Sequence, residues 1–441
     1  MRTGHDAVDA VGVGIGPANL SLAALLADEP GLTATFIDRK PDFDWHAGLM
    51  LPDARMQVSF LKDLVTPVDP TNPYSFLSFL VERKRLYRLL VTGRDRVPRK
   101  EFEQYCRWAA GRLPSLRFGV AASGIEWDGR AFTVHTGSGS LRARNVVCGT
   151  GRSPYLPECA AGHDDRRVFH AARLLDAPRE FGGARVAVVG GGQSGAEVVH
   201  HLLHHADRPA SIVWGSSRAN LFPLDDSPFV DELFLPNYSR YFHGLAPVRR
   251  ARLLEQQRMA SDGVSVDLLE AIYQRLYDLE ALDGVERPCH ILMDHRLVAI
   301  EEAAGALRVV WTAEGDPRPL SRTVDYVVCA TGYRHGLPEL LNGIGDRLPL
   351  RQGRPVVRSD FSLDWDGPAE HRIYVQNAAR HEFGVADPNL SLLAWRSAII
   401  ANSLLGRERY DTGPVSAAVD WAPAPEEPDR PLDVALNGHC R

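Results

Sequence analysis

Short apolar runs alternate with amphipathic stretches along most of the chain, as expected for strands that are followed by helices. The first such unit has an apolar run at residues 7–11, a helical stretch at 19–26 and a second apolar run at 35–37. The same order returns within residues 186–214, where the helical stretch covers 196–204. Strand, helix and strand units that repeat in this way predict an α/β protein with parallel sheets.

Each helical stretch begins at a glycine-rich turn. In the first turn we expect a nucleotide to contact Gly12, Gly14, Gly16, Pro17 and Asn19. Gly12 would permit the tight turn, and Gly14 would let a diphosphate approach the helix N-terminus, where amides and the helix dipole favour anions. Pro17 takes the third position of the usual GxGxxG pattern, so this turn is a variant. Asp38 ends the following strand, where an acid binds the ribose hydroxyls of adenosine.

The second turn fits the GxGxxG pattern in full. Its expected nucleotide contacts are Gly190, Gly192, Gln193, Ser194 and Gly195. The strand after it ends in Ser216, Ser217 and Arg218, without an acid. An acid would repel a 2′-phosphate, whereas serine and arginine can bond it, so this site favours NADPH over NADH. Two nucleotide sites of different character indicate electron transfer from a nicotinamide to a flavin, and therefore two Rossmann-like domains that bind FAD and NADPH.

The composition is that of a globular protein with a slight acidic excess. The net charge of −6 and the pI near 6.2 argue against nucleic-acid or acidic-membrane partners, which favour a basic surface. No apolar run approaches the roughly 20 residues that span a bilayer. Residues 1–9 lack the basic start and long apolar stretch of a signal peptide. We therefore expect a cytoplasmic protein.

The six cysteines are scattered, and none forms a CxxC pair. This spacing indicates neither a zinc site nor a redox dithiol, and we expect no metal. Disulfide reductases also carry two nucleotide-binding units, but they need a redox cysteine pair and are disfavoured. Cys148 and Cys329 end apolar runs, which predicts small buried side chains rather than reactive thiols.

Two further apolar runs end in Gly-Thr-Gly and Ala-Thr-Gly turns and would mark where the chain passes between domains. We expect an FAD-binding domain from residues 1–165 and 335–441, and an NADPH-binding domain from residues 166–334. Within the latter, residues 225–280 are expected to form a mainly helical segment that covers the substrate. The proline-rich tail from Pro423 onward is expected to be mobile.

Four separated motifs relate the chain to a known family. They are Trp45-His46-Ala-Gly-Leu-Met-Leu, Met56-Gln57-Val-Ser-Phe-Leu-Lys62-Asp-Leu, Asp325-Tyr-Val-Val-Cys-Ala-Thr331-Gly332-Tyr and Ala386-Asp-Pro-Asn389-Leu390-Ser391. Over nearly its whole length, the sequence resembles the microbial N-hydroxylating flavin monooxygenases, which include L-lysine and L-ornithine hydroxylases of siderophore pathways. Cys329 stands where Leu or Phe is commoner, which is a conservative apolar change.

This resemblance implies cofactor contacts outside the glycine turns, at Trp45, His46, Gln57, Thr331, Gly332, Asn389 and Leu390. It also implies that Lys62 pairs with the α-carboxylate of an amino-acid substrate and that Ser391 lies beside that substrate. The partners would be a small amine and molecular oxygen, and the family suggests a homo-tetramer.

Two positions bear on which amine reacts. Ornithine enzymes carry Asn where this chain has Asp231, and Thr-Asn-Tyr where it has Ala-Ser261-Asp262-Gly. Both differences resemble the lysine-type branch. Asp231 could hold the α-ammonium of an amino acid or the far end of a diamine. With a diamine, Lys62 would face a cation, which argues against a simple diamine. L-Lysine is favoured, with L-ornithine, putrescine, cadaverine and histamine as alternatives.

The implied reaction reduces FAD with NADPH, adds oxygen and lets a neutral amine attack the flavin hydroperoxide. A lysine amine, with a pKa of about 10.4 in water, must first lose its proton, which burial favours. Ser261 and Asp262, with bound NADP, are expected to stabilise the hydroperoxide. A different class of protein, a nucleotide-binding flavoprotein without turnover, would use the same folds.

Overall fold

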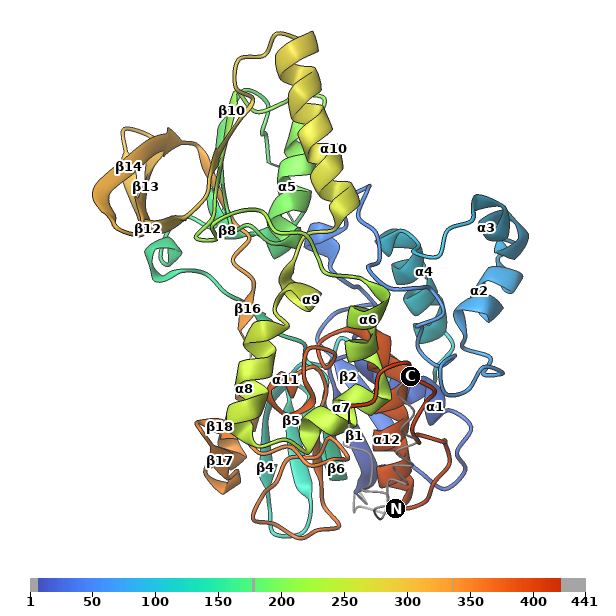
Figure 1. The fold of residues 1–441 in the computed structure, drawn as a ribbon. Coiled ribbons are helices and arrows are strands. Elements are labelled where there is room, and N and C mark those ends of the chain that lie inside the picture. The colour runs from blue at the N-terminus through green and yellow to red at the C-terminus, as the bar shows by residue number, and fades with distance from the viewer. Residues whose placement is uncertain (1–6, 177–178, 335, 422–441) are drawn as a thin grey trace, which may run out of the picture.

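Two sheets, one above the other in Figure 1, organise the protein. The structure is a computed structural model that describes residues 7–176, 179–334 and 336–421. The first sheet has the order β3-β2-β1-β6-β5-β4, with β19 beside β6. Its strands are β1 (Val8–Val13), β2 (Ala34–Asp38), β3 (Leu116–Phe118), β4 (Ala122–Trp127), β5 (Phe132–Thr136), β6 (Gly139–Cys148) and β19 (Ile373–Val375).

The first sheet is parallel around β1, which pairs with β2 and β6, while β4 and β5 form an antiparallel edge. The C-terminal part of the chain returns to this sheet through β19, which pairs in parallel with β6. The helices around it are α1 (Pro17–Leu25), α2 (Phe76–Glu82), α3 (Leu86–Thr92), α4 (Arg99–Ala110), α11 (Arg380–Phe383) and α12 (Leu393–Leu405). Every residue of α1 is buried, because it packs between the sheet and α12.

The second sheet is entirely parallel and has the order β11-β10-β9-β15-β8. Its strands are β8 (Val168–His170), β9 (Arg185–Val189), β10 (Ser211–Gly215), β11 (Cys289–Leu292) and β15 (Tyr326–Cys329). Both nucleotide-type units are therefore confirmed, each at the centre of its own sheet. On one face lie α5 (Gln193–His204) and α10 (Val266–Tyr277), which pack against each other.

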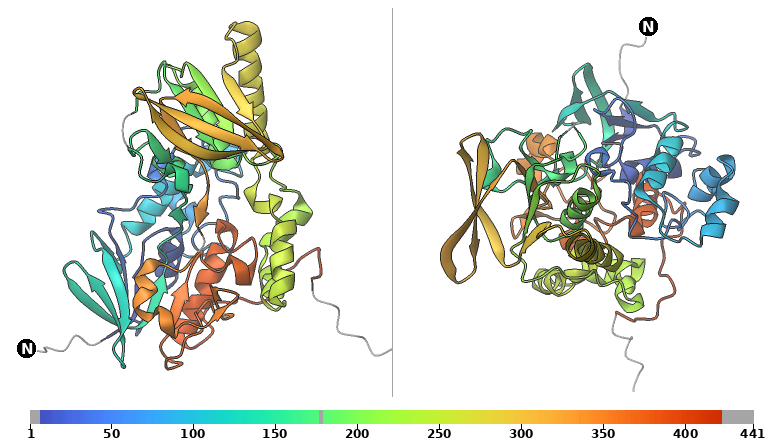
Figure 2. Two further views of the ribbon diagram at one scale, coloured as in Figure 1. Left: turned by 90° about the vertical axis from the view of Figure 1, so that its left-hand side faces the viewer. Right: turned by 90° about the horizontal axis from the view of Figure 1, so that it is seen from above.

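An antiparallel ribbon covers the other face of the second sheet, and the sequence analysis did not predict it (Figure 2). It consists of β12 (His295–Ala303), β13 (Ala306–Ala313) and β14 (Asp316–Val324). Trp311 of the ribbon is fully buried, and a Cβ atom on Gly215 would come within 2.4 Å of its ring. The absence of a side chain on Gly215 therefore lets the ribbon lie close to β10.

Two short strands connect the sheets. β7 (Ser153–Pro154) and β16 (Tyr333–Arg334) pair in antiparallel fashion, at the two places where the sequence predicted passage between domains. The exact domain boundaries at residues 165 and 335 stay a prediction.

The helical segment 225–280 divides between the two halves of the molecule. Its helices are α6 (Pro228–Asp231), α7 (Pro236–His243), α8 (Pro247–Gln256), α9 (Met259–Asp262) and α10. Tyr238 and Phe242 of α7 and Ala260 of α9 join the core of the first sheet, whereas Ile272 of α10 joins the core of the second. α10 therefore packs on the second sheet, while the expectation that residues 225–280 cover the substrate stays a prediction.

Other sequence expectations concern single features. Cys148 and Cys329 are buried, and burial raises the pKa of each thiol to about 12, as expected for inert side chains. Among the residues that the structure describes, no helix is both long and apolar enough to cross a membrane. The tail from Pro423, the first six residues and Cys440 lie outside the described residues.

Candidate active site

The first glycine turn lies between β1 and α1, but in a different register from the one predicted. Gly12 is inside β1, where a Cβ atom would come within 2.1 Å of the Phe36 ring. Gly14 opens the turn with a φ of +90°, and a Cβ there would lie 2.6 Å from the Gly149 carbonyl oxygen. Gly16 is the N-cap of α1, and a Cβ there would meet no protein atom within 4 Å. Gly16 rather than Gly14 therefore leaves space for a diphosphate.

The second turn repeats this geometry. Gly190 opens it with a φ of +125°, and a Cβ there would lie 2.2 Å from the Ala330 carbonyl oxygen. The N-caps match closely, with φ −101° and ψ −176° at Gly192 against φ −99° and ψ −178° at Gly16. A Cβ on Gly195 would come 2.1 Å from the Gly190 carbonyl oxygen, so Gly195 allows α5 to pack on β9.

Matching the two turns places Asn19, not Pro17, at the third position of the first pattern. Pro17 is the buried first residue of α1, where proline is favoured. Asn19 is fully buried: its amide donates to the Gly14 carbonyl at 2.8 Å and accepts from Gln376 at 2.8 Å. Gly12, Pro17 and Asn19 thus build the turn from within the protein, and their contact with a nucleotide stays a prediction.

The N-termini of both helices are prepared for an anion. Neither α1 nor α5 has a side-chain cap, so the free N–H groups of their first turns remain for a ligand, although Pro17 of α1 contributes none. Asp38 is buried at the end of β2, and its carboxylate accepts from Ile15 N–H at 2.7 Å and lies 3.7 Å from Lys40 Nζ. Asp38 thus fixes the first turn from the position where a ribose is expected. Ser194 lies half-buried in the first turn of α5.

The end of β10 places an arginine across the second turn. Ser216 is buried and accepts a hydrogen bond from Arg218 N–H at 3.1 Å, while Ser217 is exposed. Arg218 Nη1 donates to the carbonyl oxygens of Gly191 at 3.2 Å and Asp262 at 2.7 Å. A cation therefore lies beside the N-terminus of α5, as the preference for a 2′-phosphate requires.

Ser261 and Asp262 lie next to this turn, at the end of α9. The Asp262 carboxylate is 3.8 Å from Arg258 Nε and 3.9 Å from Arg380 Nη1. The Ser261 hydroxyl accepts from Arg380 at 3.1 Å and donates to Asp262 at 2.9 Å. These two residues organise arginines beside the NADPH-type turn, and their role toward a flavin hydroperoxide stays a prediction.

Lys62, Ser391 and Asp231 come together from three distant segments. Lys62 Nζ donates to the Ser391 hydroxyl at 3.4 Å, which in turn donates to Asn389 Oδ1 at 2.9 Å. Asn389 is the N-cap of a short 3-10 helix, Leu390–Leu392. Asp231 is exposed; partial desolvation raises the pKa of its carboxylate, and the positive charge of Lys62 opposes that rise. The Lys62 ammonium is therefore within electrostatic range of the Asp231 carboxylate.

Trp45 and His46 lie between the two halves of the molecule. Trp45 packs against Phe102 with ring centroids 5.3 Å apart and against His46 at 4.8 Å. His46 keeps solvent-accessible surface, but the surrounding protein removes much of its hydration. This desolvation, followed by the charges of Arg99 and Arg152, lowers the pKa of His46 to about 4. The imidazole is therefore neutral near pH 7.

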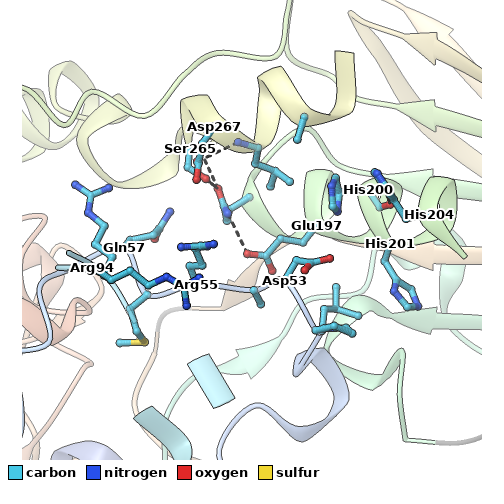
Figure 3. A pocket seen from close by; sticks show the side chains of 18 of the residues that line it. Asp53, Arg55, Gln57, Arg94, Glu197, His200, His201, His204, Ser265 and Asp267 are labelled. Carbon is cyan, nitrogen blue, oxygen red and sulfur yellow. Dashed lines mark hydrogen bonds between the residues drawn. The ribbon is translucent and has the colours of Figure 1, made fainter. Parts of the chain in front are cut away.

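A cavity of about 880 Å³ lies where residues 51–57 and 94–96 of the first half face α5 and α10 (Figure 3). Gln57, expected at the flavin, and Gln193, expected at NADPH, both line it. Gln193 donates to Glu197 at 2.9 Å and accepts from the backbone of the α10 N-cap at 2.9 Å. Its side-chain amide thus bonds within the protein, and a nucleotide contact of Gln193 stays a prediction.

Glu197, which lines this cavity, forms an ion pair that the sequence did not predict. Arg99, the first residue of α4, donates to both oxygens of Glu197 at 2.8 and 2.6 Å. The two side chains are only 16% and 6% exposed. Glu197 is the one acidic residue of α5, and that isolated acid was the only signal in the sequence. The pair joins α4 of the first half to α5 of the second.

Thr331 and Gly332 belong to the connection between the sheets. The Thr331 hydroxyl donates to the Tyr155 carbonyl oxygen, and the Gly332 carbonyl accepts from Tyr155 N–H at 2.9 Å and bonds His170 Nε2 at 2.9 Å. Gly332 has a φ of +80°, a conformation that favours glycine. Both residues therefore fix the connecting strands. Within the described ranges, no group of three or more His, Cys, Asp and Glu side chains could hold a metal.

Comparison with known proteins identifies the family. Residues 6–335 match the family model described as L-lysine 6-monooxygenase/L-ornithine 5-monooxygenase. The chain belongs to this family. The resemblance drawn from its motifs is therefore confirmed, as is the α/β fold with two Rossmann-like units.

Relatives of this N-hydroxylating monooxygenase differ in the amine that their names give. L-Lysine N6-monooxygenase of Escherichia coli is 40% identical over 418 residues, covering 94% of this chain and 98% of that protein. A cadaverine monooxygenase of Erwinia amylovora, solved with FAD, has a TM-score of 0.88 at 32% identity and covers 96% of this chain and 100% of its own. An ornithine N-hydroxylase of Kutzneria sp. 744, solved with reduced FAD, NADP⁺ and L-ornithine, has a TM-score of 0.85 at 31% identity, with 91% and 99% covered.

Proposed function

We propose that this enzyme hydroxylates the side-chain amine of L-lysine, using FAD, NADPH and molecular oxygen. Its family contains N-hydroxylating monooxygenases of siderophore pathways, and FAD and NADPH are its cofactors. The lysine assignment is supported by one observation: the opposite charges of Lys62 and Asp231 lie within electrostatic range of each other.

A pair of opposite charges suits the backbone end of an amino acid. Lys62 would bind the α-carboxylate, helped by the Ser391 hydroxyl that already contacts its ammonium group. Asp231 would bind the α-ammonium, and that cation would favour the charged form of the carboxylate, whose pKa partial desolvation raises. A diamine has no carboxylate, so it would leave Lys62 facing a cation. The 40% identity to a lysine N6-monooxygenase supports the same choice.

The residues of the chain fit both cofactors. The uncapped N-termini of α1 and α5 and the open space at Gly16 suit the diphosphates, while Asp38 stands at a ribose position and Arg218 at a phosphate position. Bound FAD supplies the chemistry that reduces and activates oxygen. The protein orients the amine through Lys62 and Asp231 and excludes water, which lowers the pKa of the reacting amine toward the neutral form.

The decisive experiment is a substrate panel that measures hydroxylated product against NADPH consumed. L-Lysine, L-ornithine, cadaverine, putrescine and histamine should be compared at equal concentration. We expect L-lysine to give the highest kcat/KM and the tightest coupling of product to NADPH. If cadaverine or putrescine gives a higher kcat/KM than L-lysine, a diamine replaces L-lysine as the proposed substrate, with Asp231 as the ammonium ligand. If none of the amines stimulates oxygen uptake, the protein is a flavoprotein without turnover.

A further inference from the structure

A second cavity, of about 460 Å³, lies among α8, α11 and the hairpin of β17 (Leu350–Arg351) and β18 (Arg354–Pro355). Five arginines line it: Arg250, Arg258, Arg351, Arg354 and Arg380. Three carboxylates also line it: Glu255, Asp262 and Glu382. His381 is there too, and burial lowers its pKa, so it adds no charge near pH 7. The lining therefore carries a net positive charge.

Several of these guanidinium groups have unused donors. Arg250 is only 4% exposed and pairs with Glu382, yet its Nε has no hydrogen-bond partner among the described residues. The Nε of Arg380 is also buried without a partner there. Arg351 and Arg354 are exposed and make no ion pair or side-chain hydrogen bond within the described part of the chain, so only the Nε atoms of Arg250 and Arg380 are buried donors without acceptors. Buried donors without acceptors are costly and rare, so an acceptor from outside the chain would complete this cavity.

The hairpin holds two of the arginines in a fixed relation. Its turn residues, Gln352 and Gly353, have φ values of 53° and 72°, the pattern of a tight two-residue turn. Positive φ at a residue other than glycine is uncommon. Arg351 and Arg354 pair across this turn, so their cationic ends start from one rigid element.

We propose that this cavity binds a small metabolite through its phosphate or carboxylate oxygens, at a site separate from NADPH. Its volume lies in the range of small-molecule sites, roughly 300–1,000 Å³. Arginine forks match the geometry of phosphate and carboxylate groups. The adenosine end of a Rossmann-bound nucleotide lies over the end of the second strand, here at Ser216, whereas α11 and the hairpin belong to the other half of the molecule.

Asp262 couples the cavity to the NADPH-type turn. Its carboxylate lies near Arg258 and Arg380 in the cavity, while its backbone carbonyl accepts from Arg218 beside Gly192. A bound anion would draw Arg258 and Arg380 away from Asp262 and would add negative charge near the NADPH diphosphate. Both effects weaken NADPH binding. Occupancy therefore raises the KM for NADPH to a plateau, by roughly 5-fold, because separate sites couple by a finite factor.

The test uses the FAD-loaded enzyme saturated with NADP⁺, with inorganic phosphate and succinate as probes at constant ionic strength. Calorimetry should detect saturable binding of at least one probe. The double variant Arg351→Ala/Arg354→Ala should weaken that binding at least about 10-fold, as expected for the loss of two charge-assisted contacts. The control double variant Arg83→Ala/Arg88→Ala removes the same two positive charges from exposed positions, because Arg83 follows α2 and Arg88 lies in α3. It should leave binding of the probe unchanged.

Three results would overturn the proposal. They are probe binding that does not saturate, an equal loss of probe binding in both double variants, and a KM for NADPH that rises linearly with probe concentration. The last result indicates competition, so the cavity would be part of the NADPH site itself. None of these outcomes alters amine hydroxylation in the absence of the probes, so failure here is distinguishable from failure of the proposed function.

Discussion

At the scale of single residues, the proposal of L-lysine as the substrate depends on Lys62. We expect Lys62→Ala to raise the KM for L-lysine about 30- to 1000-fold, because a charge-assisted pair in a closed site contributes on the order of 2–4 kcal/mol. FAD content and the rate of flavin reduction by NADPH should stay the same. Steady-state kinetics with product detection measures the first effect, and the absorbance of the purified flavoprotein measures the second.

Two controls distinguish loss of the pair between Lys62 and the substrate carboxylate from a general loss of positive charge. Cadaverine, which is lysine without its carboxylate, should be a poor substrate of the native enzyme and should lose little more in Lys62→Ala. Lys84→Ala removes an exposed lysine at the end of α2 and should have no effect on KM. An equal loss of kcat/KM for lysine and cadaverine in Lys62→Ala would show that Lys62 does not bind the substrate carboxylate.

The lowered pKa of His46 makes the stability of the folded protein depend on pH. This pKa is about 4 in the folded protein against 6.5 in the unfolded chain. Between these values the unfolded chain binds a proton that the folded protein does not, so stability present above pH 6.5 is lost as the pH falls toward 4. The Tm of the flavin-free protein should therefore fall less for His46→Gln than for the native chain between pH 7 and 4.5. Parallel curves for the two proteins would contradict this assignment.

At the scale of elements, the two strand–turn–helix units share one geometry, so they offer matched variants. Gly16 and Gly192 are extended N-caps where a Cβ atom would meet nothing closer than 3.8 Å. Gly16→Val should fold normally but lower FAD affinity roughly 10- to 100-fold, because its side chain would enter the space of the diphosphate. Gly192→Val should spare FAD and raise the Kd for NADPH by a similar factor.

Each variant is the control of the other, with Tm as a measure of folding and titration as a measure of affinity. Gly14 is less suited to this test, because its positive φ and its contact with Gly149 would strain the fold of any substituted chain. Normal FAD binding in Gly16→Val would mean that the diphosphate lies elsewhere.

At the scale of the whole molecule, the Arg99–Glu197 pair sets how the halves meet. Arg99 also lowers the pKa of His46, so it stands between the expected flavin site and the helix that begins at the NADPH turn. We expect Glu197→Gln to slow flavin reduction by NADPH about 10- to 100-fold, because small displacements of reacting groups cost rates of this size. Reduction by dithionite, which needs no nicotinamide alignment, should be unchanged in stopped-flow measurements.

The exposed pair of Arg142 and Asp128, at the antiparallel edge of the first sheet, provides the comparison. Asp128→Asn removes a similar contact far from the cavity and should leave both reductions unchanged. The exchange Arg99→Glu/Glu197→Arg should restore part of the rate if the pair acts by holding the halves together. Equal slowing by NADPH and dithionite would instead indicate general damage to the flavin site.

The sequence by itself determined the two nucleotide units, because strand, turn and helix are local patterns of apolar periodicity and glycine. Its family motifs also led correctly to an N-hydroxylating flavin monooxygenase. The ends of the predicted elements differ from the observed ones by only a few residues, as at α1, which begins at Pro17 rather than Asn19.

Only the tertiary structure decided what depends on neighbours distant in the chain. The register of the first turn needed the contacts of Gly12 with Phe36 and of Gly14 with Gly149, which no local pattern contains. The division of the helical segment depended on which core each apolar face met. The Arg99–Glu197 pair and the cavity lined by arginines join residues about 100 positions or more apart. Such contacts arise from packing of complete elements, so periodicity and motifs could not specify them.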